Sequence, residues 1–406
     1  MRVLIIGSVW VEPTSTAAGS RMLQLLELFL EQGWELTFAT TAGPSEHAFD
    51  LESLGIRVAT IQLNDVTFDT FAKTLSPQLV LFDRFMTEEQ FGWRIAEQCP
   101  DALRILDTED LHCLRKAREL AVKEQRPYTQ QDLISDVAKR EIASIYRSDL
   151  TLMISTVEMK LLQNFFKVPE NLLWYLPFLL ERLDANFIPF EDRIHFMSIG
   201  NFLHTPNWDA TVQLKQHIWP LIRKELPKAE LQVFGAYPSE KVKQLDNAKE
   251  GFLVKGRAEN AMEVIQNAKV LLAPLRFGAG LKGKFIDAMQ CGTPSVTTAI
   301  GAEGMHEDLP WSGAIAEKHA AFAKAAIELY TQKETWLTAQ DNGVKIINTQ
   351  FQKDTYAESL IAGLQSLSND LSQHRSHNFT GQMLLHHSMK STLFMSKWIE
   401  AKNAKR

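Results

Sequence analysis

The sequence predicts an α/β protein of two domains, each built on a parallel sheet covered by helices. Its 406 residues exceed one ordinary core and suit two domains of about 180 residues each. Short apolar runs alternate with stretches of helical periodicity in both halves, the pattern that parallel sheets produce. Residues 181–193 (ERLDANFIPFEDR) contain a proline and no clean period, which indicates a linker. We expect a first domain over 1–185, a linker at 186–193 and a second domain over 194–368.

The composition is that of an ordinary globular protein, with 45% hydrophobic and 23% charged residues. The net charge of −6 argues against a general nucleic-acid binder, so we expect no nucleic-acid partner. Cys99, Cys113 and Cys291 are too scattered for a zinc site made of cysteines alone, and they suit a reducing compartment. No apolar run approaches the roughly 18 residues of a membrane span, and MRVLIIGS does not resemble a signal peptide. We therefore expect a cytoplasmic protein.

The first half opens with a strand–helix–strand unit, which favours a parallel sheet. A strand at Arg2–Ser8 precedes a helix closed by Gly33 and a strand at Glu35–Thr41. The loop between strand and helix lacks the glycine spacing of dinucleotide-binding proteins. Further strands are expected at Arg57–Leu63, Gln78–Asp83, Leu103–Asp107, Leu150–Thr156 and Leu172–Leu176. Residues 114–147 are long and highly charged, which predicts a helical insertion with a solvated face.

Acidic residues and a histidine follow the expected strand Leu103–Asp107. The run DTEDLHCLR, residues 107–115, lies where open α/β sheets bind ligands, at the carboxyl end of a parallel strand. Asp110 and His112 are therefore candidates for a ligand site. Asp107 and Asp110 could equally cap the helix that starts near Leu111, because Asp is a favoured helix cap.

The second half contains the most informative stretch, residues 269–304. A buried strand at Val270–Leu275 leads into a glycine-rich loop, a helix, a turn and another short strand. The loop has no acid, three cations (Arg276, Lys282 and Lys284) and three glycines that let a ligand approach the backbone. Free N–H groups, the positive end of a helix dipole and ammonium charge together favour a phosphate. Asp287, one turn further on, could accept hydrogen bonds from ribose hydroxyls.

This stretch resembles the donor half of the GT-B glycosyltransferases of family 4, also called group 1. In that family a strand, an E-x7-E loop-helix and a G-x-P-V-V-x-T segment form the nucleotide-sugar site, and the likeness is strongest over 195–304. The resemblance implies two Rossmann-like domains facing a cleft, with a C-terminal helix that crosses back to the first domain. It also implies a nucleotide-diphosphate sugar as donor.

The resemblance assigns roles to individual residues. The implied catalytic residues are Asp110, His112, Lys282 and Lys284. The implied donor-binding residues are Gly200, Asn201, Gly235, Arg257, Gly278, Ala279, Gly280, Leu281, Asp287 and Glu303. The acceptor-side loop of the first domain would hold Gly19 and Arg21. No metal or other cofactor is expected, because the two lysines would neutralise the leaving diphosphate.

The chain departs from the family pattern at three places. The family usually has a histidine at the end of the 103–107 strand, where this chain has Asp110 with His112 two residues later, so either could face the sugar. The usual arginine and lysine after Gly200 are replaced by Asn201 and Asn207. Ala279 stands where the first acid of E-x7-E is expected, and Glu303 is the candidate replacement.

The composition of residues 369–406 predicts a basic helical tail. Residues 371–406 contain six basic residues and a single acid, Glu400. The resemblance implies that the tail helix crosses back onto the first domain, but lysines among aromatics and methionines equally suit an anionic membrane surface. We expect the early part to cross back and the last four residues, NAKR, to form a free basic end. Peripheral contact with the inner face of a membrane therefore stays open.

The leading functional hypothesis is a retaining glycosyltransferase of polysaccharide biosynthesis. It would move a sugar from a nucleotide-diphosphate sugar to a glycan or lipid-linked acceptor. The same fold hosts nucleotide-sugar 2-epimerases, which are the first alternative. A non-catalytic nucleotide- or glycan-binding module is the second, because Ala279 and Asn201 are neutral where charges are usual.

Overall fold

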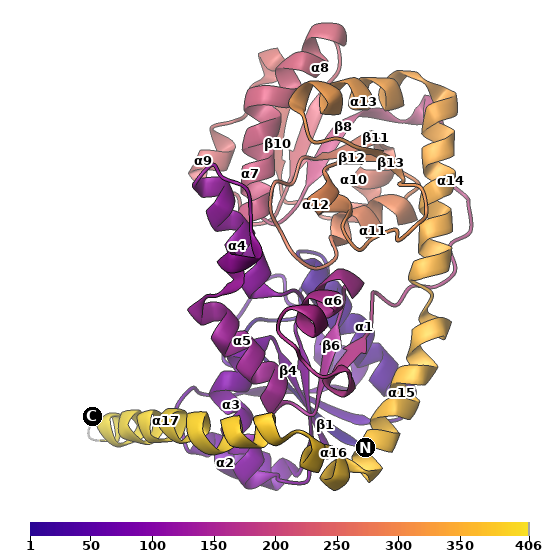
Figure 1. Cartoon of the computed structure of the whole chain (residues 1–406). Helices are drawn as coiled ribbons and strands as arrows, with labels where there is room; N and C mark the ends of the chain where they lie inside the picture. Colours follow the sequence, from indigo (N-terminus) through magenta and orange to yellow (C-terminus); the bar gives the residue numbers. More distant parts are fainter. Residues whose placement is uncertain (405–406) are drawn as a thin grey trace.

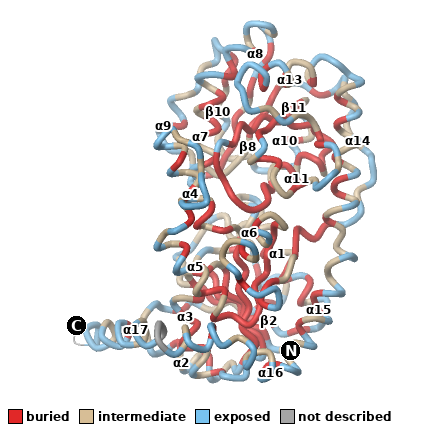
Figure 2. Tube along the Cα trace, viewed as in Figure 1, coloured by how far each residue is buried: buried red, intermediate tan, exposed pale blue. Residues whose placement is uncertain are grey.

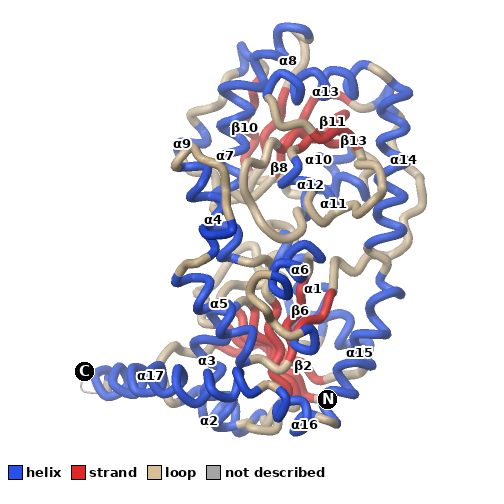
Figure 3. Tube along the Cα trace, in the orientation of Figure 1, coloured by secondary structure: helices blue, strands red, loops and turns tan. Residues whose placement is uncertain are grey.

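The computed structural model describes residues 1–404, without the side chains of residues 387–389. Two α/β domains lie one above the other, and each contains a parallel sheet (Figure 1). The strands of the two sheets form separate red groups in Figure 3. The arrangement confirms the predicted fold class.

The first sheet has the strand order β3-β2-β1-β4-β5-β6-β7, and all its strand pairs are parallel. Its strands are Arg2–Gly7 (β1), Glu35–Thr40 (β2), Arg57–Thr60 (β3), Leu79–Asp83 (β4), Leu103–Asp107 (β5), Leu150–Met153 (β6) and Leu173–Tyr175 (β7). Its helices are Ala17–Glu31 (α1), Thr67–Leu75 (α2), Phe85–Gln98 (α3), His112–Lys123 (α4), Asp136–Arg147 (α5) and Thr156–Asn164 (α6).

The second sheet has the order β10-β9-β8-β11-β12-β13 and is also parallel throughout. Its strands are Ile194–Ile199 (β8), Leu231–Phe234 (β9), Phe252–Gly256 (β10), Ala268–Ala273 (β11), Ser295–Thr297 (β12) and Gly313–Ile315 (β13). Its helices are Thr205–Gln213 (α7), Trp219–Glu225 (α8), Glu240–Lys243 (α9), Ala261–Asn267 (α10), Gly283–Gln290 (α11), Ala299–Ala302 (α12), His319–Thr331 (α13) and Lys333–Gln350 (α14).

Both faces of the first sheet are covered, which explains why its strands read as continuous apolar runs. Successive residues of β1 enter different cores, with Leu4 and Ile6 on one face and Val3 and Ile5 on the other. This alternation follows from the two-residue period of a strand. The central strands β4, β5 and β6 are buried along their whole length, within the red region of the first domain in Figure 2.

The C-terminal helices return to the first domain earlier than predicted. Leu180 pairs with the returning chain, because its N–H donates to the Phe351 carbonyl (2.8 Å) and its carbonyl accepts from the Lys353 N–H (2.9 Å). Helix α15 (Lys353–Asn369) buries Leu360 and Leu364 in the core of the first domain. The predicted second-domain boundary at residue 368 is therefore wrong by one whole helix.

The tail helix α17 (Phe379–Asn403) packs on the first domain, as predicted. It follows α16 (Leu371–His377) and contacts α3 and α5. Arg94 on α3 pairs with Glu400 and donates to the Ser396 hydroxyl (3.1 Å). Of the predicted free basic end, Lys405 and Arg406 lie outside the described residues. No helix in the described part of the chain has an apolar stretch long enough to cross a membrane.

The predicted helical insertion at 114–147 is an ordinary crossover. Helices α4 and α5 connect β5 to its neighbour β6, as helices do in parallel sheets. Their charges predicted a solvated face, but α5 lies between α3 and α17 and carries the buried Glu141. The charge pattern was misleading because Glu88 and Arg147 form a buried ion pair between α3 and α5.

Candidate functional site

Two helix N-termini, one from each domain, meet at the domain interface. Helix α1 begins at Ala17 and helix α11 begins at Gly283. A Cβ atom on Gly283 would lie 2.5 Å from the Cβ of Ala17, so only a glycine permits this approach without a shift. Because both helices present free N–H groups and positive dipole ends here, the interface favours an anion.

Lys282 and Lys284 lie beside these helix ends. Lys282 precedes α11 and is 9% exposed, whereas Lys284 lies in its first turn and is half-buried. The Lys282 Nζ donates to the Gly280 carbonyl (2.8 Å), and the Lys284 Nζ donates to the Asn207 Oδ1 (2.7 Å). Burial lowers the pKa of each lysine to about 8, so both are mainly charged at neutral pH. Within residues 1–404, neither ammonium group forms an ion pair with a carboxylate.

The loops after β8 and β9 orient Lys284. A Cβ on Gly200 would lie 2.6 Å from the Asn207 side chain, and one on Gly235 would lie 2.2 Å from the Gly200 carbonyl oxygen. Asn207 in turn donates to the Asn201 carbonyl (2.8 Å). The Asn201 carbonyl therefore orients the neutral side-chain amide of Asn207, and the oxygen of that amide accepts the hydrogen bond from Lys284.

Asp287, on α11, carries a carboxylate without a partner. It accepts no hydrogen bond within the described residues, and burial raises its pKa to about 7. A half-buried carboxylate with free lone pairs is a suitable acceptor for ligand hydroxyls. This geometry is compatible with the predicted ribose contact.

Asp287→Asn should weaken binding of a nucleoside diphosphate by roughly 1–3 kcal/mol, because the amide accepts fewer hydroxyl hydrogen bonds. The deficit should be largest above pH 7 and shrink below it, where the wild-type carboxyl, with its pKa of about 7, is itself protonated. Calorimetric titrations on both sides of pH 7 measure this difference. An affinity equal to wild type at both pH values would show that Asp287 is only a helix-face acid.

Asp110, rather than His112, lies against the glycine-rich loop that precedes α11 in the second domain. A Cβ on Gly280 would come within 2.9 Å of the Asp110 Cβ. Burial opposes ionisation of Asp110, but the Arg115 guanidinium, with its Nε 2.6 Å from the Asp110 Oδ2, holds the pKa of Asp110 at about 2. The His112 ring packs edge-on against Phe85, and burial lowers its pKa to about 4.

Neither Asp107 nor Asp110 caps α4, contrary to the capping interpretation. Glu141 accepts hydrogen bonds from the His112 and Cys113 N–H groups, both at 2.9 Å. Glu158 accepts from the Leu111 N–H (3.1 Å). The helix is thus capped by acids from α5 and α6, which is why no local motif marks its start.

Gly19 and Arg21 do not form an acceptor-side loop, and this prediction is wrong. Both lie inside α1. Arg21 is 1% exposed, pairs with Asp107 (3.2 Å) and donates to the Leu176 carbonyl (2.6 Å). Gly19 packs against Glu12, whose carbonyl oxygen would lie 2.4 Å from a Cβ at this position. Both residues stabilise the first domain internally.

Glu303 is engaged by a residue that the sequence did not single out. Arg118 on α4 donates to both Glu303 oxygens (2.7 and 2.8 Å) and to the Gly278 carbonyl (2.9 Å). These contacts join the two domains. The proposed sugar contact of Glu303 would have to replace part of this bidentate pair.

Glu158 is a second unpredicted residue between the domains. Its Oε1 accepts hydrogen bonds from Leu111 in the first domain (3.1 Å) and from Gly280 in the second (2.8 Å). The side chain is fully buried, its other oxygen has no partner within the described residues, and burial raises its pKa to about 8. The Gly280 amide, predicted to face a phosphate, therefore faces Glu158 instead.

The remaining predicted donor residues divide between interface and core. Arg257 donates to the Thr14 hydroxyl of the first domain (3.0 Å). Ala279 and Leu281 are buried, each 8% exposed, and pack in apolar cores. Within the described residues, no group of histidine, cysteine or acidic side chains is arranged to hold a metal ion.

Comparison with solved structures gives the class of the protein. The chain resembles sucrose-phosphate synthase from Thermosynechococcus elongatus (TM-score 0.65, 15% identity, 90% of this chain and 98% of that one). It also resembles S. aureus TarM (0.69, 9%, 91% and 99%) and Anabaena HepE in complex with UDP and glucose (0.62, 12%, 90% and 100%). At these identities the likeness establishes the fold, which is that of the GT-B glycosyltransferases.

Comparison with protein families refines this result. Residues 193–332, most of the second domain, match the family described as glycosyl transferases group 1. Together with the fold, this supports a glycosyltransferase enzyme. No curated protein matches the chain in sequence.

Proposed function

We propose that the protein is a retaining glycosyltransferase that uses a nucleotide-diphosphate sugar. The observation that carries this proposal is the pair of lysines, Lys282 and Lys284, beside the meeting N-termini of α1 and α11. Unpaired charge is costly to bury, so an anion that reaches both ammonium groups would gain a large stabilisation. A diphosphate has the negative charge to neutralise both.

The proposed reaction needs no protein nucleophile. The bond between the anomeric carbon and the diphosphate oxygen breaks, and a bond from the acceptor oxygen forms on the same face of the sugar. The acceptor proton passes to the departing phosphate oxygen. Lys282, Lys284 and the N-terminus of α11 would stabilise the negative charge that develops on the leaving group.

UDP is the nucleotide to test first, because it is the nucleotide named for the HepE and TarM complexes. The experiment incubates the protein with a panel of nucleotide sugars, with and without glycan and lipid-linked acceptors, and follows products by mass spectrometry. Turnover that requires an acceptor supports the proposal. Conversion without an acceptor would indicate an epimerase or hydrolase, and binding without conversion would indicate a non-catalytic module.

We also propose that the enzyme works in the cytoplasm at the inner face of a membrane. The exposed face of α17 would contact the lipid surface. One face of this helix exposes Phe394, Met395 and Trp398, each 58–66% exposed, beside Lys390 and Lys397. Glu400, the one acid on α17, is paired with Arg94 on the opposite, packed face. Exposed aromatic and basic residues together favour an anionic lipid surface.

Vesicle co-sedimentation tests this contact. The protein should sediment with phosphatidylglycerol vesicles and less with phosphatidylcholine vesicles, and Phe394→Ser with Trp398→Ser should abolish sedimentation. Leu221→Ser replaces an exposed apolar residue on α8, in the second domain, and should have no effect. Equal sedimentation of wild type and the α17 variant would contradict the membrane contact.

A further inference from the structure

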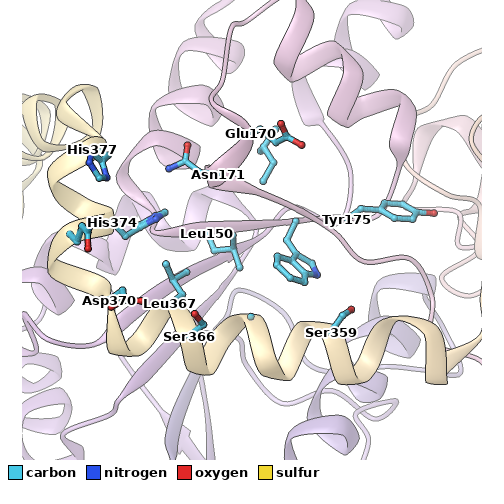
Figure 4. Close-up of a pocket in the computed structure, with 14 residues that line it drawn as sticks. Leu150, Glu170, Asn171, Tyr175, Ser359, Ser366, Leu367, Asp370, His374 and His377 are labelled. Carbon is cyan, nitrogen blue, oxygen red and sulfur yellow. The ribbon is translucent and has the colours of Figure 1, made fainter.

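A groove runs along the outer edge of the first sheet, between β7 and the returning helices α15 and α16 (Figure 4). Its volume of about 830 Å³ is typical of ligand sites. Figure 4 shows Leu150 and Asn171 on one side and Ser366, Leu367 and His374 on the other. None of the proposed donor-site residues lines this groove.

Trp174 gives the groove an aromatic wall. The indole is half-buried and rests against α15 at Gly363, where a Cβ would lie 2.7 Å from the ring. Position 363 therefore has to be a glycine for the ring to stay in place. Within the described residues the indole N–H has no hydrogen-bond partner, so the groove offers both an apolar ring and a free donor.

Exposed polar side chains surround the ring. Asn171, Asp370, Gln373 and His377 line the groove, and within residues 1–404 none of their side chains makes a hydrogen bond. No lysine or arginine lines it. The groove is therefore suited to a ligand with many hydroxyl groups and apolar faces, and is unsuited to a strongly anionic ligand.

We infer that this groove is a second saccharide-binding site, separate from the donor site. A sugar ring has an apolar C–H face that can lie on an indole, and hydroxyls that can pair with amide and carboxylate groups. An added peptide strand is disfavoured, because β7 has only three residues (Leu173–Tyr175) and offers few backbone hydrogen bonds.

One end of the groove leads toward the second domain. Tyr175 lines the groove and packs edge-on against Tyr356, with ring centroids 5.7 Å apart. Tyr175 is the last residue of β7, and Phe178, three residues later, packs in the core of the second domain. An extended glycan in the groove would thus point toward the domain interface. As a site for the acceptor chain, this role rests on the proposed function.

Binding is tested without nucleotide or turnover. Maltotetraose, cellotetraose and chitotetraose are each titrated at low-millimolar concentration against the full chain, and followed by saturation-transfer NMR. At least one should bind, and Asn171→Ala combined with Asp370→Ala should weaken it at least about fivefold. Both residues are exposed, so the fold should persist. Gln365→Ala, an exposed change on α15 outside the groove, should bind as wild type does.

The same titration includes a peptide of alternating threonine and valine as a strand-forming probe. Absence of saturable saccharide binding, binding unaffected by the double variant, or binding of the peptide alone would overturn the inference. Once an acceptor is known, the double variant should raise the KM for long acceptors and leave kcat and short acceptors unchanged. Saccharide binding in a protein without transferase activity would contradict the proposed function and leave the site standing.

Discussion

Replacing Lys282 or Lys284 by alanine is expected to lower kcat by about 100- to 1,000-fold, the scale for losing one preorganised charge contact. The loss should appear in kcat more than in KM, because the charge on the diphosphate grows as the sugar departs. Steady-state kinetics with a nucleotide sugar measure both constants. Lys255→Ala, which removes an exposed lysine of β10, should behave as wild type.

The same substitutions should leave the ligand-free protein at least as stable as wild type. Burial lowers the pKa of each lysine to about 8, which shows that the folded state disfavours the charge. The penalty is present below pH 8 and disappears as the pH rises toward the ordinary lysine pKa. A Tm at neutral pH equal to or above that of wild type therefore separates loss of charge from loss of fold. Wild-type kinetics in the double alanine variant would contradict the phosphate assignment.

The second large effect is expected at Glu158. Glu158→Ala leaves the buried N–H groups of Leu111 and Gly280 without an acceptor, at a cost of roughly 1–3 kcal/mol each. Because one group belongs to each domain, we expect weaker domain contact, a lower Tm and a large loss of kcat. Thermal unfolding and kinetics measure the two effects.

Glu158→Gln is the matched control. Burial raises the pKa of Glu158 to about 8, so the wild-type side chain is mainly neutral at pH 7. Glutamine is also neutral and keeps an oxygen for both N–H donors, so its Tm and kcat should stay close to wild type. A glutamine variant as damaged as the alanine variant would show that the ionised carboxylate is needed.

The regular elements could be predicted where the pattern is long and local. Strand β5 was predicted with the bounds that the structure shows, because it is a mainly apolar run ended by a polar residue. Strand β13 was missed, since its three residues, Gly313–Ile315, are too few to show a period. The domain return at Phe351–Gln352 was missed because neither glycine nor proline interrupts the helical pattern there.

The residues of the candidate site were likewise predicted where the signal is local in the sequence and missed where it depends on distant partners. Lys282 and Lys284 could be found because a glycine-rich loop and the helix after it are neighbours in sequence. Glu158 and Arg118 could not, because their partners Gly280 and Glu303 are 122 and 185 residues away. The resemblance placed Arg21 in an acceptor-side loop, but sequence periodicity does not show that Asp107 lies behind it.

The most direct test of the account is a crystal structure of the protein with UDP. We expect the diphosphate at the N-terminus of α11, with phosphate oxygens within hydrogen-bond distance of the Nζ atoms of Lys282 and Lys284. We expect the ribose at Asp287. A diphosphate bound away from both lysines, or UDP bound in the groove beside Trp174, would contradict the account.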